Sequence, residues 1–460
     1  MPFRVNSYPP GPQGFHLLRL LWRNRKNPLW FLVALGKDYG DSVHFRLGRR
    51  HVFFFKHPDA IREVLATKGS HFRKGLGHQW AKRFLGEGLL TSEGEFNYRQ
   101  RRLMQPAFHR DRLHAYALEM VNLTDALSRQ WRNGATIDME KCMHQVTLAI
   151  VCKTLFGAEI SKESQEIGAA LTSIVELFRR FYLSTLPLAS LRQQLPLPSN
   201  LRFKRATARL DATVDRIIQE RRRNPEDRGD LLSMLLAAQE QKEDGTAEGM
   251  SDKQLRDEVM TLLLTGHDST ANVLTWTWYL LSQHPEVEAR LHEELSAVLN
   301  GRSPTADDIP KLRYTQAVFA ESLRLYPAAF GLGRQAISDT TISGVSVPKG
   351  SVVIVSPYVT QRDPRYFQNP DAFNSERWAT EEKPSRPDFA YFPFGGGLRR
   401  CIGEQFAWME GMLIMASIAR RWKLALVPGH PIEPQGLVIL RPKGGMPMRV
   451  EYRDVTQVSA

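Results

Sequence analysis

Cysteine is scarce in this chain of 460 residues, which has only three: Cys142, Cys152 and Cys401. They form no C-x-x-C pair and their number is odd, which argues against a disulfide framework. A chain without such a framework fits a reducing compartment, and we predict a cytoplasmic protein. We expect Cys142 and Cys152 to be core residues.

Long hydrophobic runs are also absent. The apolar stretch 15–22 is short and is followed by a basic cluster at 23–26, so we expect neither a membrane span nor a secretory signal. No low-complexity tract, Gly/Ser linker or internal repeat divides the chain. The hydrophobic fraction of 42% and the charged fraction of 24% are ordinary for a globular protein. We therefore predict one large domain over residues 1–460.

Periodicity in the first half of the chain predicts a hairpin followed by helices. Apolar and polar residues alternate from Tyr39 to Lys56, with Gly48 as the turn, which indicates two strands. Residues 111–236 follow a mostly helical pattern. Prolines interrupt it at 186–199, where we expect a mobile lid over a pocket.

A long, largely buried helix is predicted in the second half. It begins at a capping box, Ser251–Gln254, and stops at His284-Pro285. Further helical patterns lie at 285–299, 314–325 and 402–420, and short β-like segments at 341–347 and 351–356. Helix therefore dominates, and the absence of βαβ alternation favours a mainly α fold with small β-sheets, of the α+β class.

The segment 394–403 carries the strongest signal for chemistry. Glycines from Gly395 to Gly397 allow a sharp turn and a close approach to a flat ligand. Cys401 follows this turn and precedes a helix, whose N-terminal dipole favours an ionised sulfur. We therefore predict that Cys401 is an axial ligand to a metal.

The spacing of this segment resembles the haem-binding loop of the cytochrome P-450 superfamily. Its five marker positions are matched by Phe394, Gly397, Arg399, Cys401 and Gly403. By background frequency, five such matches would arise in about one chain in ten thousand. The resemblance implies a haem-thiolate fold with haem b as cofactor and Cys401 as the ligand of its iron. It also implies that Phe394 shields the sulfur and that Gly395 belongs to the cofactor-binding loop.

Polar residues gather in the middle of the long helix, where the pattern predicts apolar packing. The segment resembles the oxygen-activation motif of the same superfamily, with Gly266 as the glycine, Asp268 as the acid and Ser269 as the alcohol. Serine replaces the usual threonine, and Thr270 follows it, so either hydroxyl is a candidate for proton relay with Asp268. Gly266 could permit a local opening of the helix.

Three arginines are candidates for binding the haem carboxylates. Arg101, Arg334 and Arg399 fall at positions where the family binds them, and guanidinium groups suit carboxylates. Asn97 stands where the family often has tryptophan and could donate a hydrogen bond.

A structural ion-pair cluster is also implied. Glu321 and Arg324 are three residues apart on one helical face, where they can pair. The segment 371–378 resembles the family's source of a second arginine, here Arg377, although Ser375 replaces the usual proline. We expect this trio to hold the scaffold rather than to take part in chemistry.

Substrate contacts follow no shared sequence pattern, so we name apolar residues as candidates. At each of these positions, ordinary core packing is the alternative role. The candidates are Trp80, Phe84, Leu89, Phe178, Tyr182, Leu264, Ala328, Ala329, Phe330 and Leu332. Their character favours a fatty acid, a terpenoid or a similar lipid.

The resemblance implies a monooxygenase that activates O2 with two external electrons and hydroxylates or epoxidises an apolar substrate. Because little precedes the proline hinge at Pro9–Pro12, the chain resembles soluble bacterial members, which take electrons from a ferredoxin and its NAD(P)H-dependent reductase. The net charge of +13 fits such an acidic partner, and no motif suggests nucleic acid. The arginines expected nearest the docking face are Arg99, Arg101, Arg102, Arg399 and Arg400.

Two other classes remain open at this stage. One is a haem-thiolate isomerase or dehydratase that needs no external electrons. The other is a non-catalytic protein that binds haem or lipid. The polar cluster at Asp268 argues against both, because neither class needs a proton relay to oxygen.

Overall fold

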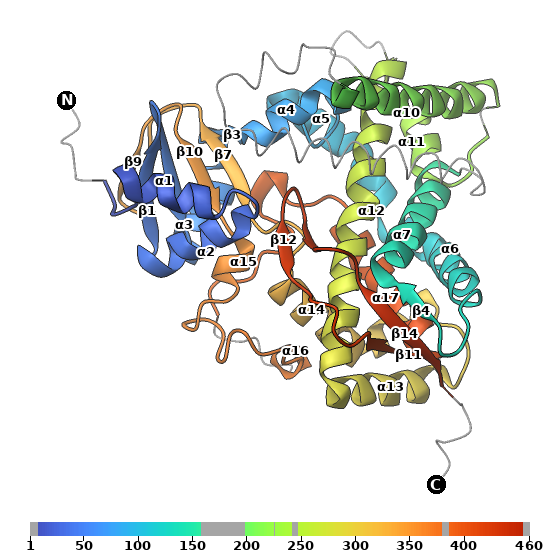
Figure 1. The fold of residues 1–460 in the computed structure, drawn as a ribbon. Helices are drawn as coiled ribbons and strands as arrows, with labels where there is room; N and C mark the ends of the chain where they lie inside the picture. The colour runs from blue at the N-terminus through green and yellow to red at the C-terminus, as the bar shows by residue number, and fades with distance from the viewer. Residues whose placement is uncertain (1–7, 158–197, 225, 242–246, 380–385, 454–460) are drawn as a thin grey trace. The chain divides into compact units, whose positions relative to one another are not determined.

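The computed structural model describes residues 8–157, 198–224, 226–241, 247–379 and 386–453 (Figure 1). The chain divides into two compact units, each built from separate segments of sequence. We call them the sheet unit (Met1–Trp80, Ala320–Cys401 and Glu433–Lys443) and the helical unit (Ala81–Phe319, Ile402–Ile432 and Gly444–Ala460). One domain over residues 1–460 stays a prediction.

A five-stranded sheet organises the sheet unit, in the order β1-β2-β10-β7-β3. Its strands are β1 (Ser42–Leu47), β2 (Arg50–Phe55), β3 (Phe72–Lys74), β7 (Leu332–Ala336) and β10 (Val352–Val355). The predicted hairpin is confirmed as β1 and β2, and Gly48 in their turn has a φ of 61°. Strand β10 runs parallel to β2, and the other neighbours are antiparallel.

Both faces of this sheet are buried, because its strands are apolar at consecutive positions. On one face, Phe53 and Phe55 pack with α3 (Pro58–Arg62) and the π-helical turn η1 (Glu63–Thr67). On the other, Phe54 packs with α1 (Gly14–Arg23) and α2 (Pro28–Asp38). Successive side chains of a strand point to opposite faces, so this alternation fixes which helices cover which face.

The remaining elements of the sheet unit are short. They are η2 (Gly69–His71), β8 (Thr340–Ile342), β9 (Val345–Val347), α15 (Pro357–Thr360), α16 (Glu376–Ala379), η5 (Gly397–Arg399), β12 (Pro434–Gly436) and β13 (Leu440–Pro442). Strands β8, β9 and β10 lie within the predicted β-like segments, 341–347 and 351–356, or one residue beyond them, so that prediction is confirmed.

Helix α12 (Asp252–Gln283) is the central element of the helical unit. The predicted capping box is present, with the Ser251 side chain accepting from the Gln254 N–H and the Gln254 side chain accepting from the Ser251 N–H. The helix ends at Gln283, with His284 as its C-cap before Pro285, as predicted. It is continuous through Gly266, so the local opening is not seen. A Cβ at Gly266 would lie 3.1 Å from Val151 of α7 (Met139–Phe156), so glycine here permits close helix packing.

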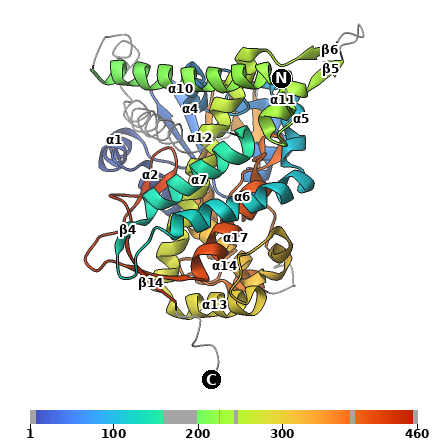
Figure 2. The ribbon, with the colours of Figure 1, turned by 90° about the vertical axis from the view of Figure 1, so that its right-hand side faces the viewer.

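Other helices and small sheets complete the helical unit (Figure 2). In both ribbon views α10 crosses the N-terminal end of α12, where Arg222 donates to Asp252 at 2.6 Å. The helices are α5 (Gly94–Met104), η3 (Gln105–Phe108), α6 (Arg110–Ser128), α10 (Pro198–Arg223), α11 (Leu231–Ala237), α13 (Pro285–Leu299), η4 (Ala306–Lys311) and α17 (Glu404–Ala419). The strands are β4 (Thr136–Asp138), β5 (Gln239–Gln241), β6 (Ala247–Gly249), β11 (Trp422–Leu426) and β14 (Pro447–Tyr452). Two of the points at which the chain passes from one unit to the other lie within helices, in α4 (Leu76–Leu85) and α14 (Arg313–Leu325).

The observed class agrees with the prediction of a mainly α protein with small sheets. None of the described helices is long and apolar enough to cross a membrane. Residues 186–197 of the expected lid lie outside the described residues, and Pro198 and Ser199 begin α10.

Candidate functional site

The loop that carries Cys401 depends on its glycines. Gly395 and Gly397 have φ values of 73° and 65°, in the left-handed region that favours glycine. A Cβ at Gly397 would lie 2.0 Å from the Leu65 carbonyl oxygen, so a larger residue cannot fit without moving the backbone. The Cys401 N–H donates to the Phe394 carbonyl at 3.0 Å and closes the loop. Cys401 itself is exposed.

An exposed single thiol on a rigid glycine turn fits a haem iron. Within the described part of the chain, no three His, Cys, Asp or Glu side chains gather into a metal site. A haem iron needs only an axial ligand from the protein, because the macrocycle supplies the other four ligand atoms. The donor set around Cys401 is therefore compatible with haem and provides nothing for a metal held by protein side chains alone.

Basic residues also gather in the sheet unit, in an arrangement that suits the carboxylates of haem. Lys74 of β3 lies directly opposite Arg334 of β7, and each residue is only 6% exposed. Burial, together with the charges of Arg334, Lys74 and Arg399, lowers the pKa of His78 to about 4. Like charges on facing strands repel each other, so an anion bound among these groups would stabilise them. We call Lys74, His78, Arg334 and Arg399 the basic cluster.

Sequence reasoning named Arg334 and Arg399 but missed Lys74 and His78. A lysine in a three-residue strand carries no sequence signal, whereas its burial in the structure is unusual for lysine. Arg399 is also held in place, because its guanidinium donates to the carbonyl of Phe72 at 2.8 Å and to that of Gly69 at 3.5 Å.

The two remaining cofactor candidates lie in α5 of the helical unit. Arg101 is half-buried there. The Asn97 amide nitrogen donates to the Leu89 carbonyl and to the Ser92 hydroxyl, both at 2.9 Å. Asn97 therefore holds the turn that precedes α5.

Asp268 does not stand alone on α12. His144 of α7 places Nε2 at 2.8 Å from the Asp268 Oδ1 atom, and the Asn272 amide nitrogen lies 3.0 Å from the same oxygen. The His144 Nδ1 atom is 2.8 Å from the Glu140 carbonyl oxygen. A backbone carbonyl and a carboxylate both accept, so this arrangement favours the protonated ring of His144, in which both nitrogens donate. Asp268 is only 4% exposed, so its carboxylate is largely shielded from water.

The pKa of His144 reflects this pairing. Burial alone would lower it, but the hydrogen bond to Asp268 and the charge of that carboxylate raise it overall. His144 was not predicted from sequence, because a histidine 124 residues from its partner carries no local signal. Only the packing of α7 on α12 brings the two together.

We expect the His144–Asp268 pair to make stability depend on pH. Because folding raises the pKa of His144, the pair stabilises the fold fully at pH values below the histidine pKa of the unfolded chain, which is about 6.5. This stabilisation is lost as the pH rises through the pKa that His144 has in the folded protein. Asp268→Asn should therefore lower the unfolding temperature most at acidic pH and progressively less above neutrality. Unfolding temperatures of wild type and variant across pH, with NMR titration of the His144 ring protons, measure this.

Asp307→Asn is a matched control for that experiment. It removes the carboxylate of the exposed pair His114–Asp307, whose N–O distance is 3.1 Å. Exposed pairs contribute little, so the control should change the unfolding temperature only slightly at any pH. An Asp268→Asn effect that is constant across pH would contradict the ion pair.

The two candidate hydroxyls point to different surroundings. Ser269 is half-buried, as are Leu264, Thr265 and Gly266 on the same stretch of α12, and its hydroxyl donates to the Thr265 carbonyl at 2.8 Å. Thr270 is buried, and its hydroxyl faces the carboxyl of Glu410 on α17. Burial raises the pKa of Glu410 well above its usual range, which the Thr270 hydroxyl only partly offsets. Glu410 was not among the predicted site residues.

The predicted trio Glu321, Arg324 and Arg377 is brought together in the sheet unit. Arg324 donates to both Glu321 oxygens at 2.7 and 2.8 Å, and Arg377 donates to Glu321 at 3.2 Å. Both Glu321 and Arg324 are fully buried. The indole N–H of Trp378 and the backbone N–H of Asn374 also donate to the Glu321 carboxylate. Arg324 further donates to the carbonyls of Gln361, Pro370 and Ala372.

The substrate candidates divide by burial. Phe330 belongs to the core of the sheet unit, and Phe84 is buried with its ring edge-to-face against Phe203 at 5.7 Å between centroids. These two residues therefore have clear packing roles. The partly exposed candidates are Leu89 and Leu264 in the helical unit and Ala328, Ala329 and Leu332 in the sheet unit. Trp80 lies on α4, while Phe178 and Tyr182 lie outside the described residues.

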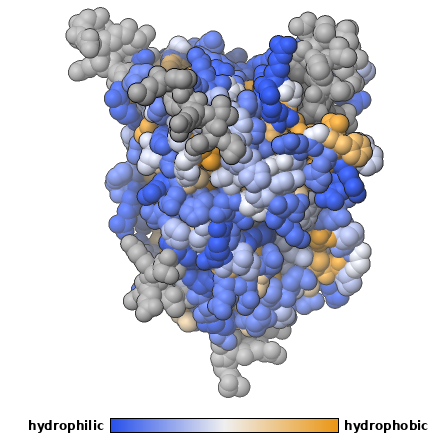
Figure 3. Space-filling view, turned by 90° about the vertical axis from the view of Figure 1, so that its left-hand side faces the viewer, coloured by the Kyte–Doolittle hydropathy of each residue, from blue (hydrophilic) through white to orange (hydrophobic). Residues whose placement is uncertain are grey.

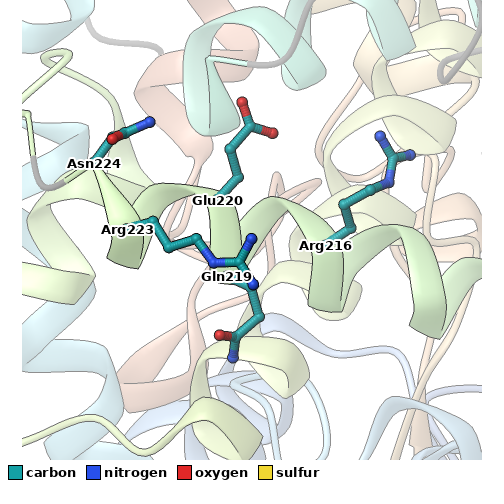
Figure 4. A pocket seen from close by; sticks show the side chains of 5 residues that line it. All are labelled: Arg216, Gln219, Glu220, Arg223 and Asn224. Carbon is teal, nitrogen blue, oxygen red and sulfur yellow. The ribbon is translucent and has the colours of Figure 1, made fainter.

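A hollow on α10 lies apart from these predicted residues. Figure 4 shows the side chains that line it, all from one helix or its end: Arg216, Gln219, Glu220, Arg223 and Asn224. None of them was predicted for the site, and none brings a second element to the hollow. We assign it no part in the chemistry.

Comparison with known proteins gives one consistent result. A family model described as Cytochrome P450 matches residues 9–447. The chain is 40% identical to cyclooctatin synthase of Streptomyces melanosporofaciens, over 89% of this chain and 88% of that protein. It is 38% identical to cyclooctat-9-en-7-ol 5-monooxygenase of the same organism, over 89% and 87%. It is 35% identical to pentalenene oxygenase of Streptomyces avermitilis, over 90% and 91%.

Proposed function

Because this chain belongs to the cytochrome P450 family, it is a haem-thiolate monooxygenase, and we propose that it oxidises a cyclic terpenoid. Its cofactor is haem b, which, when bound through a thiolate, activates O2. One oxygen atom enters the substrate as a hydroxyl or epoxide. The other leaves as water, with two electrons and two protons consumed.

The observation that carries the terpenoid proposal is the identity of the relatives. Two proteins that are 35% and 38% identical over most of both chains oxidise pentalenene and cyclooctat-9-en-7-ol, as their names state. The partly exposed candidates Leu264, Ala328 and Leu332 support an apolar ligand, and their aliphatic side chains suit a hydrocarbon ring system without fixed polar groups. The names of the three relatives state no fatty-acid substrate, which is the other class predicted from sequence.

An optical titration of the ferric protein tests this proposal. A cyclic sesquiterpene or diterpene should cause a saturable low-to-high-spin shift as substrate displaces water from the iron, whereas a long-chain fatty acid should cause little change. Product analysis with NAD(P)H and a ferredoxin system should then find one added oxygen atom from O2. A shift with the fatty acid alone would contradict the terpenoid proposal.

We further propose that Asp268 passes protons to the oxygen site and that Ser269 is the assisting alcohol. His144 supports the first role, because it holds the Asp268 carboxylate in one orientation and links it toward solvent through a side chain that is 26% exposed. The direction of the hydroxyls supports the second role. Ser269 lies on the partly exposed stretch of α12, whereas Thr270 faces Glu410.

Asp268→Asn should slow product formation by about a hundredfold, because it removes a group that donates and accepts protons. Haem should remain bound, and more of the electrons should appear as peroxide. Ser269→Ala should reduce the yield of product per NAD(P)H more than Thr270→Ala does. The amounts of product formed, NAD(P)H consumed and peroxide released in the same reaction test these expectations.

Ser269→Thr is the matched control for the alcohol, since it keeps the hydroxyl and adds the methyl group that the family usually has. It should retain or improve the yield of product. If Thr270→Ala were the more harmful variant, Thr270 would be the assisting alcohol.

We propose a ferredoxin and its NAD(P)H-dependent reductase as the source of electrons, since bacterial P450 monooxygenases use redox partners. Arg400 and Leu398 are exposed in the Cys401 loop, and Arg102 is exposed on α5, which supports an acidic partner. Turnover that needs only peroxide would contradict this. The cytoplasmic location stays a prediction.

A further inference from the structure

Helix α1 exposes an apolar stripe. Phe15, Leu18 and Trp22 are 81%, 64% and 68% exposed, among the most exposed large apolar side chains in the described residues. Spacings of three and four residues place them on one face of the helix. Leu17 and Leu20 lie on another face and are buried. The helix is therefore apolar on two faces, of which the sheet unit covers only one.

The helix is held firmly in this orientation. Leu17 packs in the core cluster that contains Leu29 and Phe54. The Asn24 amide nitrogen donates to the Leu20 carbonyl at 2.9 Å and caps the C-terminal end of the helix. Asn27, in the turn before α2, donates to the Pro434 carbonyl at 2.8 Å and accepts from the Gly436 N–H at 2.9 Å. The exposed stripe is thus a fixed surface of the fold.

Cations border the stripe. Arg19 and Arg23 are exposed on α1, and Arg25 and Lys26 are exposed just after it. The guanidinium of Arg25 lies 4.3 Å from the centre of the Trp22 ring. From Tyr8 to Lys37 the sequence contains no aspartate or glutamate. We call Phe15, Leu18 and Trp22, with these four cations, the α1 surface.

We propose that the α1 surface binds the surface of a lipid bilayer that contains anionic lipids. Tryptophan, phenylalanine and leucine beside arginine and lysine are typical of helices that lie in a membrane interface. Anionic headgroups would pair with the cations while the stripe enters the boundary of the acyl chains. Because no described helix could span a membrane, the association is peripheral.

Two observations favour lipid over an acidic protein as the occupant. The three exposed apolar side chains belong to one helix of ten residues, whereas a protein interface needs a complementary patch of larger area. Figure 3 shows one face of the molecule, on which hydrophilic residues predominate and apolar residues form only small separate groups. A fluid bilayer needs no matching shape, so three protruding side chains are enough. If the substrate is a terpenoid, as proposed above, this would place the enzyme where such a substrate dissolves.

Co-sedimentation of the haem-loaded protein with sucrose-filled vesicles tests the proposal. Vesicles of phosphatidylcholine mixed with phosphatidylglycerol should bind the wild type, and binding should weaken with salt. The combined variant Phe15→Ser, Leu18→Ser, Trp22→Ser should bind at least about tenfold more weakly, since its side chains no longer insert. Leu118→Ser is the matched control, because Leu118 is 66% exposed on α6 and should not affect binding.

A second variant separates charge from insertion. Arg19→Gln with Arg23→Gln should weaken binding to the anionic vesicles while leaving the weak binding to pure phosphatidylcholine unchanged. Equal binding by wild type and the combined serine variant would overturn the proposal, as would no binding by the wild type. If the serine variant instead impaired reduction by ferredoxin without vesicles, the α1 surface would be a protein contact and the lipid proposal would be wrong. The vesicle assays use no substrate, so their results are independent of the terpenoid proposal.

Discussion

Cys401→Ser should lower turnover by at least about a hundredfold and remove the thiolate signature from the spectrum of the reduced carbonyl complex. A serine hydroxyl is far less acidic than a thiol and donates less electron density to iron, so oxygen activation loses the push that the thiolate supplies. The glycine turn should survive, because the Cys401 N–H bond to Phe394 belongs to the backbone. The carbonyl difference spectrum and product formation per haem measure the two effects.

Cys142→Ser provides the comparison for this variant. Cys142 is half-buried on α7, and burial raises the pKa of its thiol to about 11, so it is not a reactive thiolate. This change should leave the carbonyl spectrum as in the wild type. Persistence of the thiolate signature in Cys401→Ser would show that another group binds the iron.

Glu321→Gln should lower the free energy of unfolding by about 3–5 kcal/mol, the usual cost of stranding a buried charge. The variant keeps the shape of the side chain but removes the charge that faces Arg324, and both residues are fully buried. The carboxylate also accepts from Arg377, Trp378 and the Asn374 N–H, so one substitution disturbs the bonds from four donor residues. Denaturant unfolding of the haem-loaded protein measures the loss.

Glu376→Gln is the control for charge removal in the same region. Glu376 is exposed at the start of α16, so its loss should change the free energy of unfolding by less than about 0.5 kcal/mol. Arg377→Lys should lie between the two variants, because lysine keeps the charge but not the guanidinium geometry. A small effect of Glu321→Gln would mean that the cluster does not support the fold.

Local patterns were sufficient for several elements and for the glycine turn of one loop. The capping box at Ser251 and the proline after His284 set both ends of α12, because helix termini depend on residues next to them in sequence. The pair Glu321 and Arg324 was predictable for the same reason, being one helical turn apart. The glycine turn before Cys401 was recognisable because only glycine tolerates its backbone conformation.

Long-range contacts were not predictable in this way. Lys74 meets Arg334 only through the pairing of β3 with β7, whose sequence separation is 260 residues. His144 meets Asp268 only through the packing of α7 on α12. From the sequence, Phe330 and Phe84 were candidates for substrate contact, yet both are packed in the interior. The residue type alone cannot separate the two roles, because an apolar side chain suits both a substrate pocket and the core.

The sequence by itself therefore determined the family, and it predicted Cys401 as the cofactor ligand and Asp268, Ser269 and Thr270 as the acid and the candidate alcohols of α12, because each of these rests on residue type at fixed short spacing. Tertiary structure alone decided that Asp268 is paired with His144, that Ser269 and Thr270 face different surroundings, and that the basic cluster includes Lys74 and His78. It also decided which apolar face of α1 is covered and which is left exposed. The physical reason is that burial and charge pairing depend on neighbours in space, and those neighbours come from distant parts of the chain.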